Sequence, residues 1–254
     1  MTKPPNWHNE DGFEFALHPA KNGKAESLVI VLHGHGSNTQ NWEAHAEQLS
    51  KEMPFADIIN LQGPRRLPDN PDGSEGYTWT AYQGSVFSVF KQSLRLVFNH
   101  LPVVDKLDSF IDKQLVKRGL TDDDLGLFGN SMGSIVVLQT ALNRKKPPAG
   151  VVSHSGALLP FTKVRSKPDI LLIMGQKDEV FHKPEAKPKG LKKIFNAIAR
   201  RFSVQHKLTL RRLKKRKIAF TEKLFPDLTH EVTKESIHEG GSFLRKALRR
   251  RKGI

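Results

Sequence analysis

A serine flanked by glycines is the clearest chemical signal in the chain. Residues 129–133 read Gly-Asn-Ser-Met-Gly, a complete G-x-S-x-G pattern around Ser131. The apolar run 125–128 before it has the length of a buried strand, and the apolar residues of 135–142 continue without Pro or Gly, as in an interior helix. A serine on a tight strand-to-helix turn can present its hydroxyl as a nucleophile. The alternative is a glycine-rich turn whose serine only caps the helix.

Such a turn has steric and electrostatic requirements. We expect any Cβ at Gly129 or Gly133 to collide with the adjoining strand or helix, and the helix to aim backbone N–H groups at the reacting centre. The N–H groups of Met132 and His35 are the candidate donors of an oxyanion hole. His33 and His35 together could suggest a metal site, but the sequence near them offers no suitable third ligand, so neither a metal nor a cofactor is expected.

A reacting serine needs a base to accept its proton and an acid to hold that base. On a strand–turn–helix site of this kind the chain order is Ser, then the acid, then His. Among the histidines after Ser131, His230 alone has a predicted strand before it and a predicted helix after it, and we take it as the base. Asp178 follows a buried strand and is the candidate acid, with Glu179 as the alternative. Asp227 is too close in sequence to His230 to be preferred.

Strands that alternate with helices surround these residues. The patterns predict an edge strand at 13–17, a central strand buried on both faces at 28–32, and further strands at 56–61, 125–128, 150–156, 169–175 and 217–225. They predict one helix that starts from a cap at Asn38 or Thr39 and a pair of helices within 86–118, broken near Pro102. Further helices are predicted at 135–142, at 191–202 and at the end of the chain to about 250. We therefore expect residues 1–254 to form a single α/β domain with a doubly wound, mostly parallel sheet. Ligands bind such sheets outside the carboxyl ends of the strands, where all the candidate catalytic residues fall.

Two aromatic residues lie in the long polar segment 62–84, which we interpret as a surface loop. Tyr77 and Trp79 either pin this loop to the body of the protein or line a substrate cleft.

Five motifs in order resemble the small carboxylesterases, lysophospholipases and acyl-protein thioesterases of the α/β-hydrolase superfamily. They are Leu-His-Gly-His-Gly-Ser-Asn at 32–38, Gly-Asn-Ser-Met-Gly at 129–133, Ser-Gly-Ala-Leu-Leu-Pro at 155–160, Gly-Gln-Lys-Asp-Glu-Val at 175–180 and Leu-Thr-His at 228–230. The resemblance runs from about Leu28 to Leu248. It implies an α/β-hydrolase fold without a large cap domain, and an enzyme that cleaves acyl esters or thioesters.

The resemblance also implies roles for individual residues. It implies Ser131 as the nucleophile, Asp178 as the acid and His230 as the base. We place Leu159, with Tyr77 and Trp79, in the substrate-binding site.

The chain departs from the family pattern in two respects. Asn130, Met132 and Ser134 stand where the family usually has an aromatic residue, Gln and Gly. The interval of 52 residues from the acid to the base is longer than the resemblance implies, and the excess lies in a basic segment. These departures leave the reaction class intact and bear on the acyl substrate.

The positive charge of the chain is concentrated in two segments. The net charge is +15, of which a basic insertion at about 183–217 contributes +13 and residues 245–252 contribute +6, which leaves the rest at −4. The insertion could bind an anionic membrane surface. A protein that coats nucleic acid would be basic over its whole surface, so nucleic acid is not the expected partner.

Composition narrows the class further. The chain has 254 residues and no cysteine, so a thiolate nucleophile and a disulfide framework are excluded. Its first residues lack an apolar signal region and no run of 18 apolar residues occurs, so a cytoplasmic protein is expected.

These observations predict a serine esterase that acts on short to medium acyl chains of a small-molecule ester. A lysophospholipase or acyl-protein thioesterase at an anionic membrane surface is the alternative. A more distant alternative is a non-catalytic binding module that uses the basic segment. The oligomeric state is not indicated by the sequence.

Overall fold

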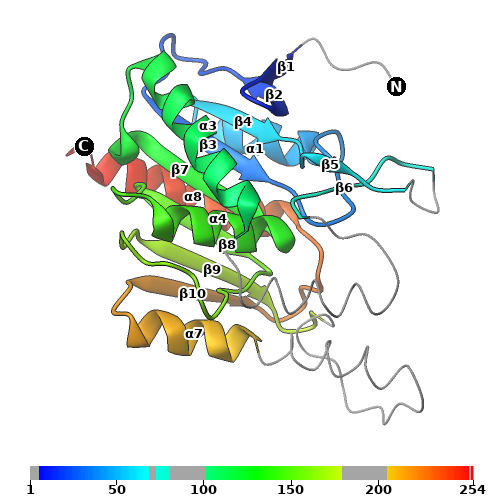
Figure 1. Cartoon of the computed structure of the whole chain (residues 1–254), viewed down its shortest axis with the longest axis vertical. Coiled ribbons are helices and arrows are strands. Elements are labelled where there is room, and N and C mark those ends of the chain that lie inside the picture. Colours follow the sequence, from blue (N-terminus) through cyan, green and yellow to red (C-terminus); the bar gives the residue numbers. More distant parts are fainter. Residues whose placement is uncertain (1–5, 69–72, 81–100, 179–204, 252, 254) are drawn as a thin grey trace.

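A mixed sheet of eight strands lies at the centre of the structure (Figure 1). The computed structural model describes residues 6–68, 73–80, 101–178, 205–251 and 253, and the statements below concern these residues. The strand order is β1-β2-β4-β3-β7-β8-β9-β10. The pairs β1/β2 and β2/β4 are antiparallel, and the other neighbours are parallel. The predicted doubly wound, mostly parallel sheet is therefore confirmed.

The elements have the following bounds. The strands of the sheet are β1 (Trp7–Glu10), β2 (Phe13–His18), β3 (Ser27–Leu32), β4 (Ala56–Leu61), β7 (Leu125–Asn130), β8 (Gly150–His154), β9 (Ile170–Gly175) and β10 (Phe220–Phe225). The helices are α1 (Glu43–Glu52), α3 (Pro102–Arg118), the 3₁₀ turn η1 (Asp122–Asp124), α4 (Met132–Asn143), α7 (Gln205–Lys215) and α8 (Lys234–Arg251). A separate two-stranded ribbon pairs β5 (Arg65–Arg66) with β6 (Tyr77–Thr78).

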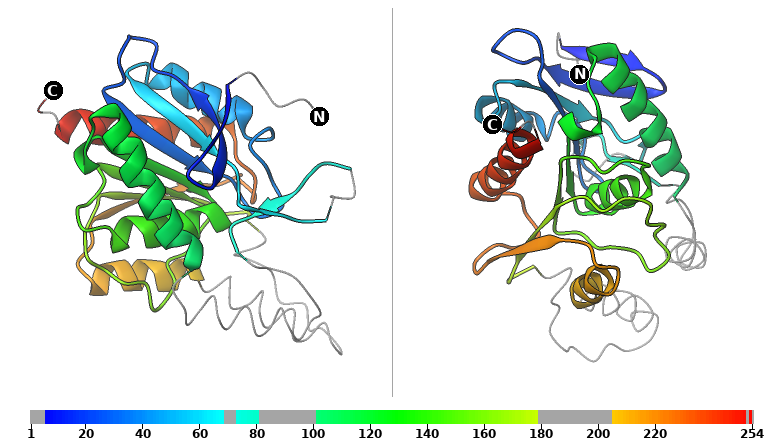
Figure 2. Two further views of the ribbon diagram at one scale, coloured as in Figure 1. Left: turned by 45° about the horizontal axis from the view of Figure 1, so that its top comes forward. Right: turned by 90° about the vertical axis from the view of Figure 1, so that its left-hand side faces the viewer.

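Helices cover both faces of the sheet (Figure 2). α1 and α8 lie on one face, and α3, α4 and α7 lie on the other. Alternate residues of β7 serve the two cores, since Leu125 and Leu127 join the cluster beneath α3 and α4 while Phe128 joins the cluster beneath α1 and α8. All residues of β3 are buried, as predicted for a central parallel strand.

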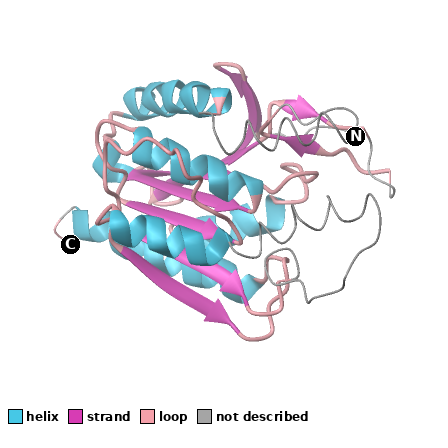
Figure 3. Cartoon of the chain, turned by 60° about the horizontal axis from the view of Figure 1, so that its bottom comes forward, coloured by secondary structure: helices cyan, strands magenta, loops and turns pink. Residues whose placement is uncertain are grey.

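The chain changes direction across the sheet between β3 and β7. It leaves β3 through α1 toward β4, and it leaves β7 through α4, on the opposite face, toward β8 (Figure 1). Figure 3, coloured by secondary structure, shows the strands of the sheet between helices. The two strands pair in parallel, with Leu32 opposite Gly129, so their carboxyl ends lie side by side. A crevice outside the strand ends forms where the chain direction switches in this way, and the candidate site occupies this position.

Two predicted details of the first part of the chain are wrong. β2 was expected at the edge of the sheet, but β1 is the edge strand, and its partly exposed Trp-His-Asn-Glu sequence has no alternating apolar pattern. The cap of α1 is Trp42, without a side-chain hydrogen bond, rather than Asn38 or Thr39. Asn38 instead accepts a hydrogen bond from the N–H of Asn41 (2.7 Å) and so forms a turn ahead of the helix.

The later part of the chain also differs in places from the prediction. The segment 62–84 contains the β5–β6 ribbon, although 69–72 and 81–84 lie outside the described residues. α3 begins at Pro102, at the predicted break, but the first helix of the expected pair and the helix at 191–202 also lie outside them. The last strand begins at Phe220 rather than 217, because α7 occupies the preceding residues and ends in a turn with Lys217 at φ 53°. The N–H of Ile218 donates to the carbonyl of Leu213 in this turn, which closes a helix without the usual glycine.

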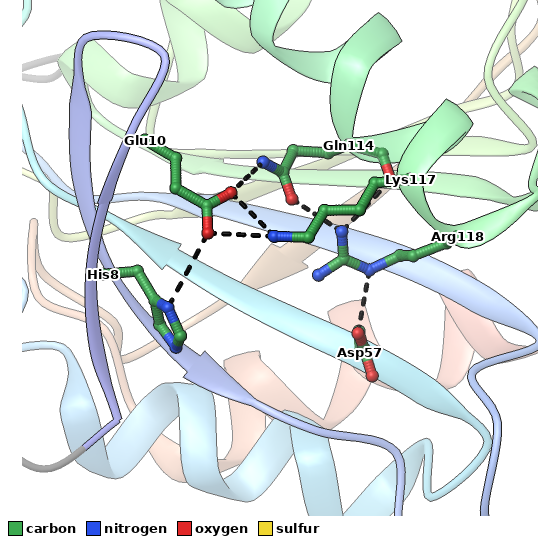
Figure 4. Close-up of polar contacts among 6 residues, drawn as sticks. All are labelled: His8, Glu10, Asp57, Gln114, Lys117 and Arg118. Carbon is green, nitrogen blue, oxygen red and sulfur yellow. Dashed lines mark hydrogen bonds and ion pairs between the residues drawn. The ribbon is translucent and has the colours of Figure 1, made fainter.

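A polar network ties the edge strand to the body of the protein (Figure 4). The carboxylate of Glu10 on β1 accepts hydrogen bonds from Lys117 Nζ (2.9 Å) and Gln114 Nε2 (3.1 Å) on α3. Arg118 Nε donates to Asp57 Oδ2 on β4 (2.8 Å). The Lys117 ammonium, and then the Gln114 amide, hold the pKa of Glu10 below its usual range. Short β1 is thus fastened at an edge where it has only one strand neighbour.

Within the described part of the chain, no helix is both long and apolar enough to cross a membrane.

A buried arginine joins α3, η1 and the end of α4. Arg144 is 4% exposed, and its guanidinium donates to three carboxylates, those of Asp108, Asp112 and Asp122. We predict that Arg144→Met lowers the free energy of unfolding by about 2–4 kcal/mol, because the partly buried carboxylates of Asp108 and Asp122 then lose their counter-charge. Urea denaturation would measure this. Lys177→Met, which breaks an exposed ion pair with Asp227, is the control and should cost under about 0.5 kcal/mol. Equal stability of the two variants would contradict this account.

Candidate active site

Ser131 occupies a strained turn between β7 and α4. Its backbone has φ 51° and ψ −112°, a region that L-residues rarely adopt. Its N–H donates to the carbonyl of His154 at the end of β8 (2.8 Å), which helps to hold this conformation. Ser131 stands at the N-cap position of α4, but its hydroxyl makes no capping hydrogen bond. The hydroxyl points instead toward the candidate base.

The expected steric demand on the two flanking glycines is confirmed. A Cβ at Gly129 would lie 2.5 Å from the carbonyl oxygen of Gly133. A Cβ at Gly133 would lie 2.4 Å from the carbonyl oxygen of Leu32 and 2.6 Å from that of His33. These neighbours are backbone atoms, which cannot rotate away. The close approach also places the N-terminus of α4 against the carboxyl end of β3.

The loop that carries His230 packs on the end of β9. A Cβ at Gly175 would lie 2.0 Å from the carbonyl oxygen of Leu228, so only glycine allows this contact. The N–H of Lys177 donates to the same carbonyl (3.1 Å). The backbone of the β9 loop, which bears Asp178, is thus joined directly to the backbone of the β10 loop, which bears His230.

The structure brings Ser131, His230 and Asp178 together. His230 Nε2 lies 2.9 Å from Ser131 Oγ, and His230 Nδ1 lies 2.9 Å and 3.0 Å from the two carboxylate oxygens of Asp178. Asp178 is 0% exposed, whereas the imidazole of His230 keeps some access to solvent. With Nδ1–H donated to the carboxylate, Nε2 is left as the acceptor for the serine hydroxyl.

The other candidate acids are placed differently. Asp227 is exposed and pairs with Lys177 Nζ (2.6 Å), away from the imidazole. Glu179 lies outside the described residues.

The loop after β3 borders the nucleophile. A Cβ on Gly34 would lie 3.4 Å from Ser131 Cβ, so this segment lies against the turn that bears Ser131. The N–H of Gly36 already donates to the carbonyl of Tyr77 (2.9 Å), which removes it as an oxyanion donor. Met132 is the first residue of α4, where an N–H has no acceptor within the helix. His35, in the loop after β3, and Met132, at the start of α4, remain the donors predicted from the sequence.

His33 has a structural role beneath this loop. Its Nδ1–H donates to the carbonyl of Gly34 (2.7 Å), and its Nε2 accepts from the N–H of Gly63 (3.0 Å). Burial lowers the pKa of His33 to about 4, so the ring is neutral near pH 7. Both nitrogens are occupied by backbone groups, and no cluster of three or more His, Cys, Asp or Glu suited to a metal ion occurs among the described residues.

The three candidate substrate-binding residues lie near this loop or after β8. Trp79 is only 2% exposed, donates from Nε1 to the carbonyl of His33 (2.8 Å) and packs on the His33 ring. The side chain of Trp79 therefore pins the loop to the body of the protein. Its burial argues against a position on the wall of a substrate cleft. Tyr77 is partly exposed and donates from its hydroxyl to Glu75 (3.0 Å), and Leu159 is largely buried.

Two further residues of the site had no role in the sequence interpretation. His154, the last residue of β8, has its ring Nε2 3.0 Å from Ser236 Oγ, and burial lowers its pKa to about 3. Its position at the end of β8, which pairs with β7, was the only available signal. Thr78 Oγ1 lies 3.0 Å from His35 Nδ1 and 3.3 Å from Met132 Sδ, and no sequence pattern pointed to it.

Comparisons with known proteins bear on the family and the fold. The model of the phospholipase/carboxylesterase family matches residues 18–248. An uncharacterized hydrolase of Mycosarcoma maydis is 26% identical over 161 residues, which are 61% of this chain and 57% of that protein. The match thus spans little more than half the length of that relative.

Solved esterases share the fold. Esterase PE8 superposes with a TM-score of 0.72 at 22% identity over 92% of this chain and 99% of that one. A carboxylesterase from Mesorhizobium loti gives 0.65 at 14% identity over 94% and 99%. Arabidopsis thaliana SOBER1 gives 0.60 at 19% identity over 87% and 99%. At these identities the likeness establishes the fold, which is the expected α/β-hydrolase fold.

The glycine at the end of β9 gives a test of how the site is assembled. We predict that Gly175→Ala lowers kcat for p-nitrophenyl butyrate at least about tenfold, because the new Cβ must displace the Leu228 carbonyl and with it His230. Steady-state kinetics on the folded fraction would measure this.

Gly126→Ala on β7 is the matched control. Its Cβ would meet only the ends of the Val29 and Leu244 side chains, at 3.2 Å and 3.3 Å, so kcat should stay within about twofold. If the two alanine variants have the same kcat, contact at Gly175 does not position the base.

Proposed function

The chain belongs to the phospholipase/carboxylesterase family, and on that premise we propose that it is a serine hydrolase that cleaves carboxylic esters of short to medium acyl chains through an acyl-enzyme on Ser131. One observation carries the proposal. An unbroken series of hydrogen bonds runs from Ser131 Oγ through His230 to the buried carboxylate of Asp178. A hydrolase of this family needs a nucleophile, and no cysteine exists to supply another.

Acylation follows from the directions of these hydrogen bonds. Ser131 Oγ attacks the ester carbonyl carbon while its proton passes to His230 Nε2. The Asp178 carboxylate holds Nδ1–H and stabilises the imidazolium that forms. The N–H groups of Met132 and His35 are the proposed donors to the oxyanion. As the intermediate collapses, the carbon–oxygen bond to the alcohol breaks and His230 returns its proton to the leaving oxygen.

Deacylation uses the same groups in reverse order. Water loses a proton to His230 Nε2 and attacks the acyl carbon, and the carboxylic acid leaves as Ser131 Oγ recovers its proton. Partial exposure of the imidazole supports this step, because water must reach Nε2. The buried Asp178 supports both acylation and deacylation, since a carboxylate shielded from solvent interacts strongly with the imidazolium of His230 beside it.

The same chemistry would serve a thioester or a lysophospholipid, which are the alternative substrates. The family description includes phospholipases, which supports a lysophospholipid as the second candidate. A panel of p-nitrophenyl esters of increasing acyl length, an acyl thioester and a lysophospholipid would rank them by kcat/KM. The highest kcat/KM on the lysophospholipid or the thioester would replace the short-ester proposal.

We predict that Ser131→Ala lowers kcat for p-nitrophenyl esters by about a thousandfold or more and abolishes labelling by a fluorophosphonate probe. His230→Ala should be about as severe, and Asp178→Asn milder, because members of a triad do not contribute equally. Unchanged melting temperatures would show that each variant is folded.

His238→Ala provides the control for loss of a histidine. His238 is exposed on α8 and pairs with Glu52, outside the site, so this variant should retain full activity. Activity and labelling that persist in Ser131→Ala would overturn the proposed acyl-enzyme on Ser131. A parent protein that neither cleaves the ester panel nor reacts with the probe would favour the binding module. An active His230→Ala beside an inactive variant of another histidine would mean that the base is wrongly assigned.

We also propose that the basic segment holds the enzyme at an anionic lipid surface. α7, its described helix, contains no acidic residue. Its apolar side is already used in the core, where Leu213 is buried. Arg212 and Arg216 donate to the carbonyls of Leu158 and Pro160 and so brace the loop after β8.

The remaining cations of the described part of this segment are exposed. They are Lys207, Arg211, Lys214, Lys215 and Lys217. These supply the electrostatic contact, at about 1 kcal/mol each at most.

Four substitutions test this surface without touching the bracing arginines. Arg211→Gln, Lys214→Gln, Lys215→Gln and Lys217→Asn together should weaken binding to phosphatidylserine vesicles at low salt by about a hundredfold or more and spare soluble-ester turnover. Asparagine is chosen at 217 because it tolerates the positive φ found there.

Neutralising Lys21, Lys24, Lys145 and Lys146, four exposed lysines elsewhere, controls for net charge and should have a much smaller effect. Vesicle affinity equal to that of the parent would contradict the proposal. Loss of duplex-DNA binding without loss of vesicle binding would assign the surface to nucleic acid instead.

A further inference from the structure

The hydroxyl of Thr78 lies between the two residues that we propose for the oxyanion hole. Thr78 Oγ1 is 3.0 Å from His35 Nδ1 and 3.3 Å from Met132 Sδ. His35 belongs to the loop after β3 and Met132 to the start of α4, so a single atom joins two separate elements. Thr78 is 1% exposed, which shields both contacts from water.

The hydrogen atoms of this arrangement can be assigned from its chemistry. A thioether sulfur can only accept, so the single hydroxyl proton of Thr78 is directed to Met132 Sδ. The oxygen is then the acceptor for Nδ1–H of His35. Burial lowers the pKa of His35, which favours the neutral ring that this arrangement uses.

Backbone contacts fix the position of Thr78 on both sides. The N–H of Tyr77 donates to the carbonyl of Ser37 (2.9 Å), and the carbonyl of Tyr77 accepts from Gly36 (2.9 Å). The next side chain, Trp79, donates to the carbonyl of His33 (2.8 Å). The segment 77–79 is thus fastened along the whole 33–37 loop. The Thr78 hydroxyl can therefore transmit that fixed position to Met132.

We propose that Thr78 is a positioning residue that sets the separation of the His35 and Met132 N–H groups and so pre-organises the oxyanion hole. This inference rests on the proposed function. A donor fixed before the reaction stabilises the oxyanion without a reorganisation cost during the chemical step. The hydroxyl acts through His35 and Met132 and does not touch the substrate.

Two substitutions separate the hydroxyl from the shape of the side chain. Thr78→Val keeps the branched shape and removes the hydroxyl, whereas Thr78→Ser keeps the hydroxyl. We expect Thr78→Val to lower kcat for p-nitrophenyl butyrate by about 10- to 100-fold with KM nearly unchanged, and Thr78→Ser to stay within about threefold of the parent.

The affinity for unreacted ester provides a second measurement, because this affinity would fall if Thr78 had only a packing role. In the Ser131→Ala background, Thr78→Val should leave the affinity for unreacted ester unchanged, while Thr78→Val alone should weaken a trifluoromethyl ketone inhibitor in proportion to its loss of kcat/KM. Thr140→Val is the matched control, since Thr140 is equally buried in α4 and its hydroxyl has no hydrogen-bond partner among the described residues.

The outcomes distinguish this inference from the proposed function. If Ser131→Ala is inactive and Thr78→Val has the kcat of the parent and of Thr140→Val, Thr78 does not position the oxyanion hole. Equal losses in Thr78→Val and Thr78→Ser, or a parallel loss of ground-state affinity, would show a packing role and overturn the inference. Activity that survives Ser131→Ala would instead remove the proposed function itself.

Discussion

Contact between bare backbones at the start of α4 is the constraint on which the candidate site depends. Gly133 lets α4 begin directly against the carbonyls that end β3, and Gly129 lets β7 turn beneath it. A side chain at either position would separate helix from strand. The strained backbone of Ser131 persists because this contact, together with the hydrogen bond from its N–H to His154, leaves no other path for the chain. The same contact brings the loop after β3 beside the nucleophile, where an oxyanion hole is needed.

Much of this arrangement could be predicted because it follows from order along the chain. In a parallel sheet, a residue that directly follows a strand lies at the carboxyl edge, so the positions of Ser131, Asp178 and His230 after their strands predicted that they would meet. The central strands were also predictable, since β3 and β7 are buried on both faces and consist of continuous apolar runs. The steric demand at Gly129 and Gly133 followed from the turn alone.

Other features depend on contacts that leave no mark on local sequence. β1 is an edge strand held by side-chain hydrogen bonds from α3, and its own residues show no strand pattern. α7 was not predicted because it lies within a run of positively charged residues. The turn that ends it places Lys217 at a positive φ without a glycine. The bracing roles of Arg212 and Arg216 require knowledge of which carbonyls they face. Thr78 is an ordinary threonine in a polar loop until the fold places it between His35 and Met132.

The distance in sequence between the nucleophile and its partner has a consequence for biosynthesis. Ser131 and His230 are 99 residues apart, and the loop that bears the histidine packs against the end of β9. A nascent chain that has emerged from the ribosome only as far as α4 therefore carries the serine without a base to activate it. It also lacks α8, which covers the apolar face shared by β7 and β8. An incomplete chain would thus expose apolar surface before the site is assembled, and exposed apolar surface is what makes partly folded chains prone to aggregate.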